Sequence, residues 1–295
     1  MIPARYEPLV APARPRRQIW RTVLGVAITG AVYFGWMVGL AALAARWQAV
    51  PFDRLLSRIS TGADPWGVIL LLAGFAGGWI GLWVTMHLLH RRRLRSLMGR
   101  APVVLRDFVL GTAILALVGG GLTLLLLPML PPLQMRPDPS TWLAFLPLAL
   151  LGVLVQTGAE ELVFRGYLQS QLAARFGLRL VYLGLPALMF GLAHFNAAEL
   201  GPDAWIVVAS TALFGLAAGD LTQRTGSLGL AWGLHFANNV LAMLVLSLMG
   251  GLGGLALFSA SEGSVPASMI RPLLISDMLV TLAVWAACRL WLRRR

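Results

Sequence analysis

Eight long apolar segments, separated by short polar connections, constrain the fold of this chain more than any other feature. A helix needs about 20 predominantly apolar residues to cross the hydrocarbon core of a bilayer. Only 12% of the residues are charged, whereas soluble domains have about 25%. The sequence therefore predicts an all-α, polytopic membrane protein with about eight transmembrane helices. The predicted spans lie near 22–45, 66–89, 106–128, 141–170, 180–197, 204–222, 228–249 and 273–292.

The basic residues set the predicted orientation. The net charge is +12, and all 24 basic residues are arginines. With eight spans and the N-terminus inside, nineteen of these arginines fall on inner segments, and cytoplasmic loops are enriched in basic residues. This explains the charge better than a nucleic-acid surface does, so we expect both termini in the cytoplasm and no nucleic-acid partner. The arginine-only composition indicates a GC-rich bacterial genome, and hence the bacterial inner (plasma) membrane.

Polar stretches divide the chain into four parts. Residues 1–21 are rich in proline and arginine and are predicted to form a disordered basic arm without a core. Residues 22–140 hold the first transmembrane helices, 141–250 hold a polar core, and 251–295 hold a Gly-rich outer loop and the C-terminal transmembrane helix. The first apolar run exceeds the about 7–15 residues of a signal-peptide core, so we expect a retained anchor although the sequence ALA at 42–44 resembles a cleavage site.

Some glycines stand four residues apart, a spacing that permits close approach of helices. Because the chain has 32 glycines, chance explains at least half of such matches. The pairs are Gly74/Gly78, Gly77/Gly81 and Gly215/Gly219.

Two adjacent glutamates and an arginine interrupt the fourth apolar segment, in the sequence QTGAEELVFRGYLQ at 156–169. A charge in the membrane is expensive, so an ionisable residue there indicates a functional site. Glu161 and Arg165 are four apart and share a helix face, whereas Glu160 is turned about 100° away. We expect Arg165 to neutralise one glutamate while the other handles a proton.

Two histidines also lie within apolar segments. His194 follows Phe190 by four residues, and His235 precedes Asn239 by four, so each pair shares a helix face. A lone buried histidine is usually only a hydrogen-bonded core residue. Two of them, together with two glutamates and an asparagine, indicate a site.

Distances along the chain test whether these residues can meet. If the chain reverses near Gly177, Glu160 and His194 are each 17 residues from the turn and therefore at equal heights on antiparallel helices. His235 is about nine residues past Gly226, so its height agrees less well unless the 160–194 hairpin projects beyond the bilayer.

The candidate residues supply the parts of hydrolysis at a carbonyl. A glutamate beside a histidine activates water as a general base, or both ligate a divalent metal that acidifies the water; the possible ligands are Glu160, His194 and His235. A second histidine and an asparagine amide donate hydrogen bonds to an oxyanion. In a membrane the obvious carbonyl is a peptide bond. The alternative is a non-catalytic immunity, scaffold or transporter-like protein whose polar network only packs helices.

Three motifs, Glu160-Glu161-x-x-x-Arg165, Phe190-x-x-x-His194 and His235-x-x-x-Asn239, resemble the signatures of the CPBP family. This family comprises CAAX prenyl proteases of the Ras-converting type and bacteriocin-processing enzymes, and is also called the Abi family. The resemblance covers roughly residues 145–245, and it implies that 141–250 form the CPBP/CAAX protease core. It implies an eight-span intramembrane endopeptidase that cleaves a membrane-associated protein or peptide in a cavity reached from the cytoplasm.

The resemblance also implies roles for single residues. Glu160 and His194 would activate the water, and His235 and Asn239 would stabilise the oxyanion. The adjacent Asn238 competes for the last role, but the helix face favours Asn239. Glu161, Arg165 and Phe190 would support the site. The cofactor stays open between a divalent metal such as zinc, as in a metalloprotease, and none, as in a glutamate-dependent protease.

Overall fold

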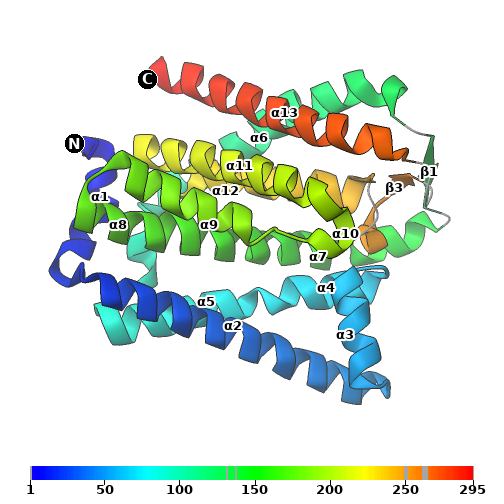
Figure 1. Cartoon of the computed structure of the whole chain (residues 1–295), viewed down its shortest axis with the longest axis horizontal. Helices are drawn as coiled ribbons and strands as arrows, with labels where there is room; N and C mark the ends of the chain where they lie inside the picture. The colour runs from blue at the N-terminus through cyan, green and yellow to red at the C-terminus, as the bar shows by residue number, and fades with distance from the viewer. Residues whose placement is uncertain (1, 131, 137, 249–251, 261–264, 295) are drawn as a thin grey trace.

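The computed structural model describes residues 2–130, 132–136, 138–248, 252–260 and 265–294 and shows a helical bundle with a small sheet at one end (Figure 1). Six helical runs are long and apolar enough to cross a membrane, as expected of the predicted integral membrane protein. They are Ile19–Gln48, Pro65–His90, Ala101–Met129, Pro139–Phe176, Gly201–Thr225 and Ser268–Arg293.

Two of the eight predicted segments form shorter apolar helices, Leu180–Leu192 and Gly229–Val245. The first ends just before His194, and the second gives way to extended backbone at Leu246. Helices too short to span are tolerated at membrane depth where protein covers the backbone ends. Each of the eight predicted segments thus contains a helix, but only six runs in the described chain have the length of a span.

Several runs join α-helices to tighter or wider helical turns, written η. The helices in chain order are η1 (Ala4–Tyr6), α1 (Glu7–Val10), η2 (Ala11–Arg16), α2 (Ile19–Gln48), α3 (Phe52–Thr61), α4 (Pro65–Gly74), α5 (Ala76–Thr85), η3 (Met86–His90), η4 (Leu94–Leu97), α6 (Ala101–Leu126), η5 (Leu127–Met129), α7 (Pro139–Glu161), η6 (Leu162–Leu168), α8 (Gln169–Phe176), η7 (Leu180–Gly184), α9 (Leu185–Leu192), α10 (Ala197–Leu200), η8 (Gly201–Asp203), α11 (Ala204–Thr225), α12 (Gly229–Val240), η9 (Leu241–Val245), η10 (Gly253–Leu255) and α13 (Ala267–Arg293).

Glycines make the closest helix contacts. A Cβ added to Gly74, Gly77 or Gly81 would lie 2.7 Å from an atom of α2, and one on Gly215 would lie 2.9 Å from the Cα of Ala187 on α9. Each of the three predicted glycine pairs therefore includes a residue at which a helix approaches its neighbour closely.

A fourth pair, which the sequence analysis did not single out, holds α12 against α6. A Cβ on Gly229 or Gly233 would lie 2.1 Å from a carbonyl oxygen of α6, that of Val104 or Phe108. Any larger side chain would separate the two helices. This contact fixes the position of α12, which carries His235.

The predicted outer loop is partly a strand and a helical turn. β3 (Phe258–Ala260) pairs antiparallel with β1 (Leu133–Met135) and parallel with β2 (Leu246–Ser247), in the order β1-β3-β2. Strands of two or three residues have no recognisable hydrophobic alternation, because pairing between distant segments creates them. Residues 249–251 and 261–264 of the predicted loop lie outside the described residues.

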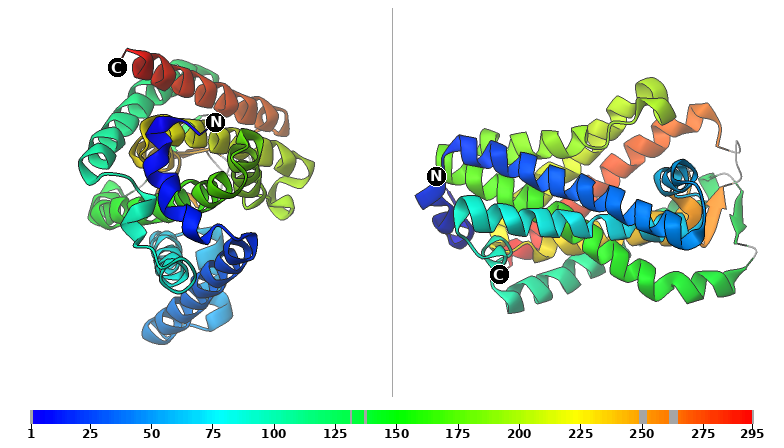
Figure 2. Two further views of the ribbon diagram at one scale, coloured as in Figure 1. Left: turned by 90° about the vertical axis from the view of Figure 1, so that its left-hand side faces the viewer. Right: turned by 90° about the horizontal axis from the view of Figure 1, so that it is seen from below.

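The N-terminal arm is folded, contrary to the predicted disorder. Its turns cross one end of the bundle (Figure 2) and bury Tyr6, Leu9, Val10 and Ala13 against α8 and Tyr182. These four residues follow the i, i+3, i+4, i+7 spacing of an amphipathic helix. The proline and arginine content is typical of disorder and hid this apolar stripe.

Both termini lie at the end of the bundle opposite the sheet (Figure 1). The arginine-rich connection 91–100 follows η3 at this same end, since α2 and α5 run in opposite directions. This arrangement agrees with termini on one side of the membrane. That this side is the cytoplasm stays a prediction.

Candidate active site

Both glutamates lie at the C-terminal end of α7, where the π-helical segment η6 begins. Such segments within α-helices are frequent at functional sites. Arg165, within η6, donates from Nη1 to Glu161 Oε1 at 3.0 Å. The two side chains are 2% and 0% exposed. The ion pair that the four-residue spacing predicts is therefore present and fully buried.

Aromatic rings enclose the guanidinium of Arg165. Its Cζ lies 4.4 Å from the ring centroid of Phe190 and 5.6 Å from that of Phe214. A cation over an aromatic face is stabilised by about 2 kcal/mol or more where water is excluded. The same rings pack against His235, with centroids 5.8 and 5.2 Å away. Phe190, a predicted supporting residue, thus contacts both the arginine and a candidate histidine.

His235, on α12, bridges the two glutamates. Its Nδ1 is 2.8 Å from Glu161 Oε1, and its Nε2 is 3.5 Å from Glu160 Oε2. A carboxylate only accepts hydrogen bonds, so His235 Nδ1–H donates to Glu161. The Nε2 of a neutral His235 then carries the lone pair and faces Glu160. The sequence analysis placed His235 near Glu160 and assigned it to the oxyanion, but it did not foresee the contact of His235 with Glu161.

Gln156 connects the first motif to the third. Its Nε2 donates to Glu160 Oε1 at 2.7 Å, and its Oε1 accepts from Asn239 Nδ2 at 2.9 Å. The sequence analysis assigned Gln156 no role, although it precedes Glu160 by four residues and therefore shares its helix face. Asn239 is half-buried, whereas Asn238 is exposed. Asn239 is therefore the asparagine that faces the site.

His194 lies in the turn after α9, at the edge of the cluster. Its Nδ1 is 2.8 Å from the carbonyl oxygen of Phe190, and its ring is 4.7 Å from the Phe190 ring. Because a carbonyl only accepts, Nδ1 carries the hydrogen and Nε2 of the neutral ring has the lone pair. Within the described chain no hydrogen bond joins His194 to Glu160, so the two meet only through neighbouring groups.

The predicted reversal at Gly177 is present. Gly177 caps α8 with a left-handed φ of 66°, and Phe164 and Phe190, each 13 residues from it, lie with ring centroids 5.1 Å apart. Equal distance from the turn therefore gives equal height in this hairpin, as the sequence analysis assumed for Glu160 and His194.

His235 reaches the same height because the hairpin is long. The run Pro139–Phe176 has 38 residues, or about 57 Å of helix at 1.5 Å per residue, well beyond the about 30 Å of a bilayer core. The α8 end of the run is capped by the folded arm. The turn at Gly177 can therefore lie farther from the site than the turn at Gly226. This explains why Glu160 is 17 residues from its turn and His235 only nine from its own.

Three buried polar atoms of this cluster have no hydrogen-bond partner among the described residues. They are Glu160 Oε2, Glu161 Oε2 and Arg165 Nη2. Leaving a buried polar atom unpaired costs about 1–3 kcal/mol, and more if it is charged. The Glu160 side chain is 13% exposed. The cluster therefore has unused hydrogen-bonding capacity for a polar molecule.

The three possible metal ligands do not converge. Among the described residues, no group of three or more His, Cys, Asp or Glu side chains is placed to hold a metal ion. A zinc site needs at least three such ligands about 2.0–2.3 Å from the ion. Glu160 and His235 are neighbours, but no contact of His194 with either residue is present among the described residues. These residues do not fit a metal in this arrangement, and we derive no step through one.

Residues 141–241 match the family model described as Type II CAAX prenyl endopeptidase Rce1-like, and all three motifs lie within the match. The uncharacterized protein YyaK of Bacillus subtilis (strain 168) is 30% identical over 149 residues, which is 50% of this chain and 50% of that protein. The chain thus aligns with about half the length of this curated relative. No solved structure gives a significant match.

Proposed function

We propose that this chain, whose residues 141–241 are of the Rce1-like CAAX prenyl endopeptidase family, is an intramembrane endopeptidase. The substrate would be a membrane-associated protein or peptide. One observation carries the proposal. His235 bridges two glutamates within the membrane-spanning bundle, with Nδ1 2.8 Å from Glu161 and Nε2 3.5 Å from Glu160.

The charges of this cluster leave room for one mobile proton. With both glutamates ionised, Arg165 protonated and His235 neutral, the four side chains carry a net charge of −1. A net charge in apolar surroundings is unfavourable, so one further proton on Glu160 or on His235 Nε2 neutralises the cluster. Such a pair can take a proton from water and return it to a leaving group.

In the proposed reaction Glu160 is the general base. Its Oε2 accepts a proton from water while the water oxygen bonds to the carbonyl carbon of the scissile peptide. The carbon–nitrogen bond then breaks, and the proton passes from the Glu160–His235 pair to the leaving amine. His194 Nε2 accepts a hydrogen bond from the second O–H of the water and so orients it; that hydrogen stays on the oxygen.

Two groups are proposed to stabilise the oxyanion, as the resemblance implies. Asn239 donates one amide hydrogen to Gln156 Oε1, and its second amide hydrogen is available to the oxyanion. His235 supplies Nε2–H when it holds the mobile proton. Gln156, bonded to the other oxygen of Glu160, keeps Oε2 as the reactive oxygen. Preorganised donors of this kind stabilise an oxyanion strongly where water is excluded.

The test compares wild type with Glu160→Gln on peptides from a membrane extract, each with and without chelator. The variant keeps the shape of Glu160 and its place beside Gln156 but lacks the base, so we expect cleavage to fall by about 10²–10⁴-fold. Asp277→Asn, which removes a carboxylate in α13 outside the site, should cleave normally. Cleavage by wild type that survives the chelator indicates a glutamate-activated water, whereas loss with chelator indicates a metal.

The alternative is a non-catalytic membrane protein. The observation that favours it is that Glu161, Arg165 and His235 join α7 to α12 whether or not chemistry occurs. Identical products from wild type and Glu160→Gln, with both proteins folded, would contradict the protease and leave this alternative. The bacterial inner membrane, cytoplasmic termini and absence of a nucleic-acid partner are part of the same proposal.

A further inference from the structure

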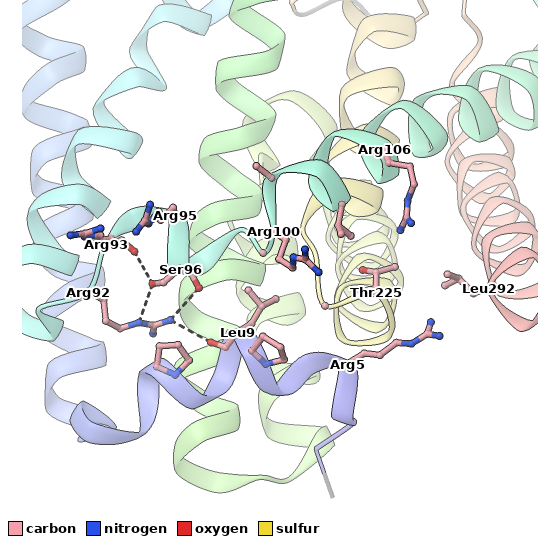
Figure 3. A pocket seen from close by; sticks show the side chains of 16 residues that line it. Arg5, Leu9, Arg92, Arg93, Arg95, Ser96, Arg100, Arg106, Thr225 and Leu292 are labelled. Atoms are coloured by element: carbon pink, nitrogen blue, oxygen red, sulfur yellow. Dashed lines mark hydrogen bonds between the residues drawn. The ribbon is translucent and has the colours of Figure 1, made fainter. Parts of the chain in front are cut away.

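A cavity of about 1140 Å³ opens at the end of the bundle that carries both termini (Figure 3). Its walls are the N-terminal arm, the connection 92–100, the first turns of α6, the turn after α11 and the end of α13. Six arginines line it, and no aspartate or glutamate is among the lining residues. The arginines are Arg5, Arg92, Arg93, Arg95, Arg100 and Arg106.

Most of this positive charge is uncompensated. Arg106 forms an ion pair with Asp107 at 2.7 Å. For the other five, the described residues offer no carboxylate within ion-pair distance. Like charges gathered around one cavity repel one another, and an anion bound between them would relieve that repulsion.

Arg92 is the least exposed of the six arginines. Its Nη2 donates to the carbonyl of Leu9 at 3.3 Å and its Nε to Ser96 Oγ at 3.3 Å, while its Nη1 is buried without a partner among the described residues. Burial lowers the pKa of Arg92 to about 10. The guanidinium is thus fixed in place, partly removed from water, and short of one acceptor.

The first turn of α6 adds to the positive potential. Ala101 and Val103 line the cavity, and the capping residue Arg100 makes no side-chain hydrogen bond to the helix. The N-terminus of a long helix carries about half a positive charge and attracts anions such as phosphate. The helix and the arginines therefore favour the same ligand.

The apolar part of the lining indicates what the anion is attached to. Val103 and Leu292 belong to the ends of two membrane-spanning runs, Ala101–Met129 and Ser268–Arg293. The cavity thus stands where the spans end, at the level of the lipid headgroups. A ligand there meets arginines on one side and apolar side chains on the other. Basic pockets between transmembrane helices bind anionic lipid headgroups by this combination.

We propose that this cavity binds the phosphate headgroup of an anionic phospholipid, with the acyl chains directed toward the ends of α6 and α13. The arm supplies Arg5, Pro8 and Leu9 to one wall, so the bound lipid would hold the arm against the connection 92–100. This inference does not depend on the proposed protease activity.

The test measures retention of lipid by the purified full chain in native mass spectrometry, with phosphatidylglycerol and phosphatidylcholine as probes. Wild type should retain phosphatidylglycerol preferentially. In Arg95→Gln/Arg100→Gln the affinity should fall about 25-fold, because each arginine near an anionic surface contributes roughly fivefold. Arg175→Gln/Arg179→Gln, which removes two exposed arginines at the same end but outside the cavity, should bind as wild type.

Two further measurements distinguish a phospholipid from a free phosphate and test whether the variants are misfolded. Arg95→Lys/Arg100→Lys keeps the charge and should keep most of the binding. Glycerol 3-phosphate, which has the headgroup without acyl chains, should compete poorly. Equal retention of both lipids, equal loss in the two glutamine variants, or full competition by glycerol 3-phosphate or by an acidic peptide would each overturn the proposal.

Discussion

Arginine occurs in two contrasting surroundings in this molecule. Arg165 is buried in the membrane-spanning part with Glu161 3.0 Å away and two phenylalanine rings close to its guanidinium. The arginines of the cavity at the end of the bundle stand together, and five of them have no carboxylate partner among the described residues. One region neutralises its charge internally, whereas the other leaves its charge open.

The difference follows from the medium around each region. A charge buried in the membrane must be paired, because its desolvation cost is not recovered otherwise. At the headgroup level, water and anionic lipid stabilise arginine, so no internal partner is required. A paired arginine is therefore expected to support the fold, and an unpaired one to support binding. The predictions below test this division.

The largest expected effect is loss of stability in Arg165→Met. The change leaves Glu161 buried without its cation, and breaking a buried pair in this way costs about 3–5 kcal/mol. The free energy of unfolding, measured by titration with a denaturing detergent in mixed micelles, should fall by this amount.

A second variant separates the charge from the packing. Arg165→Met/Glu161→Gln removes both charges, so it should recover part of the stability lost in Arg165→Met. If the double variant recovers none of the lost stability, the unpaired charge of Glu161 does not cause the loss in Arg165→Met, and the contrast between paired and unpaired arginines loses its basis.

A smaller effect is expected from Asn239→Ala, which acts on the reaction and not on the fold. Loss of one oxyanion donor lowers the rate by about 10²–10³-fold. Asn238→Ala is the matched control. Asn238 is exposed on the same helix and makes only a long hydrogen bond of 3.4 Å to Asn239 Oδ1, so this variant should cleave at the wild-type rate. Equal loss in both variants, or none in either, would remove Asn239 from the oxyanion site.

Contacts within one helix could be predicted from the sequence, and contacts between helices mostly could not. The spacing of Glu161 and Arg165 gave their ion pair, since residues four apart share a helix face. The bridge from His235 to both glutamates depends on how far each hairpin projects, and residue counts from the turns do not determine that. The eight helical segments were visible as apolar runs, but the lengths of Leu180–Leu192 and Gly229–Val245 were not.

Gln156 and the N-terminal arm were missed for another reason. Gln156 is four residues from Glu160, as Arg165 is from Glu161. It was missed because the site was sought among charged residues and Gln156 has a neutral amide. In the arm, Tyr6 to Ala13 form an apolar stripe within a composition that is typical of disorder. Spacing was the better guide in both cases.

A smaller effect, a tenfold fall in the turnover rate, is expected from Gln156→Met. The variant removes the donor that orients Glu160, and one ordinary hydrogen bond is worth about 1.4 kcal/mol, or a factor of ten. The turnover rate should fall while KM stays close to wild type, because Gln156 contacts Glu160 and Asn239 and has no proposed contact with the substrate. Gln171→Met controls for loss of packing. Gln171 is a buried glutamine in the same helical run as Gln156, and its side chain forms a hydrogen bond with His90. A fall in thermal stability without a change in the turnover rate would make Gln156 a structural residue only.

The smallest effect is expected for the cavity arginines in lipid-free detergent. Arg95 and Arg100 are exposed and form no ion pair within the described chain, so their replacement by glutamine should change the free energy of unfolding by less than about 0.5 kcal/mol. Relief of repulsion among the remaining arginines can even make the variant slightly more stable. Addition of phosphatidylglycerol should then raise the free energy of unfolding of wild type more than that of the variant. A loss above 2 kcal/mol without lipid would show that these arginines hold the fold as Arg165 does, and the two surroundings would no longer differ in kind.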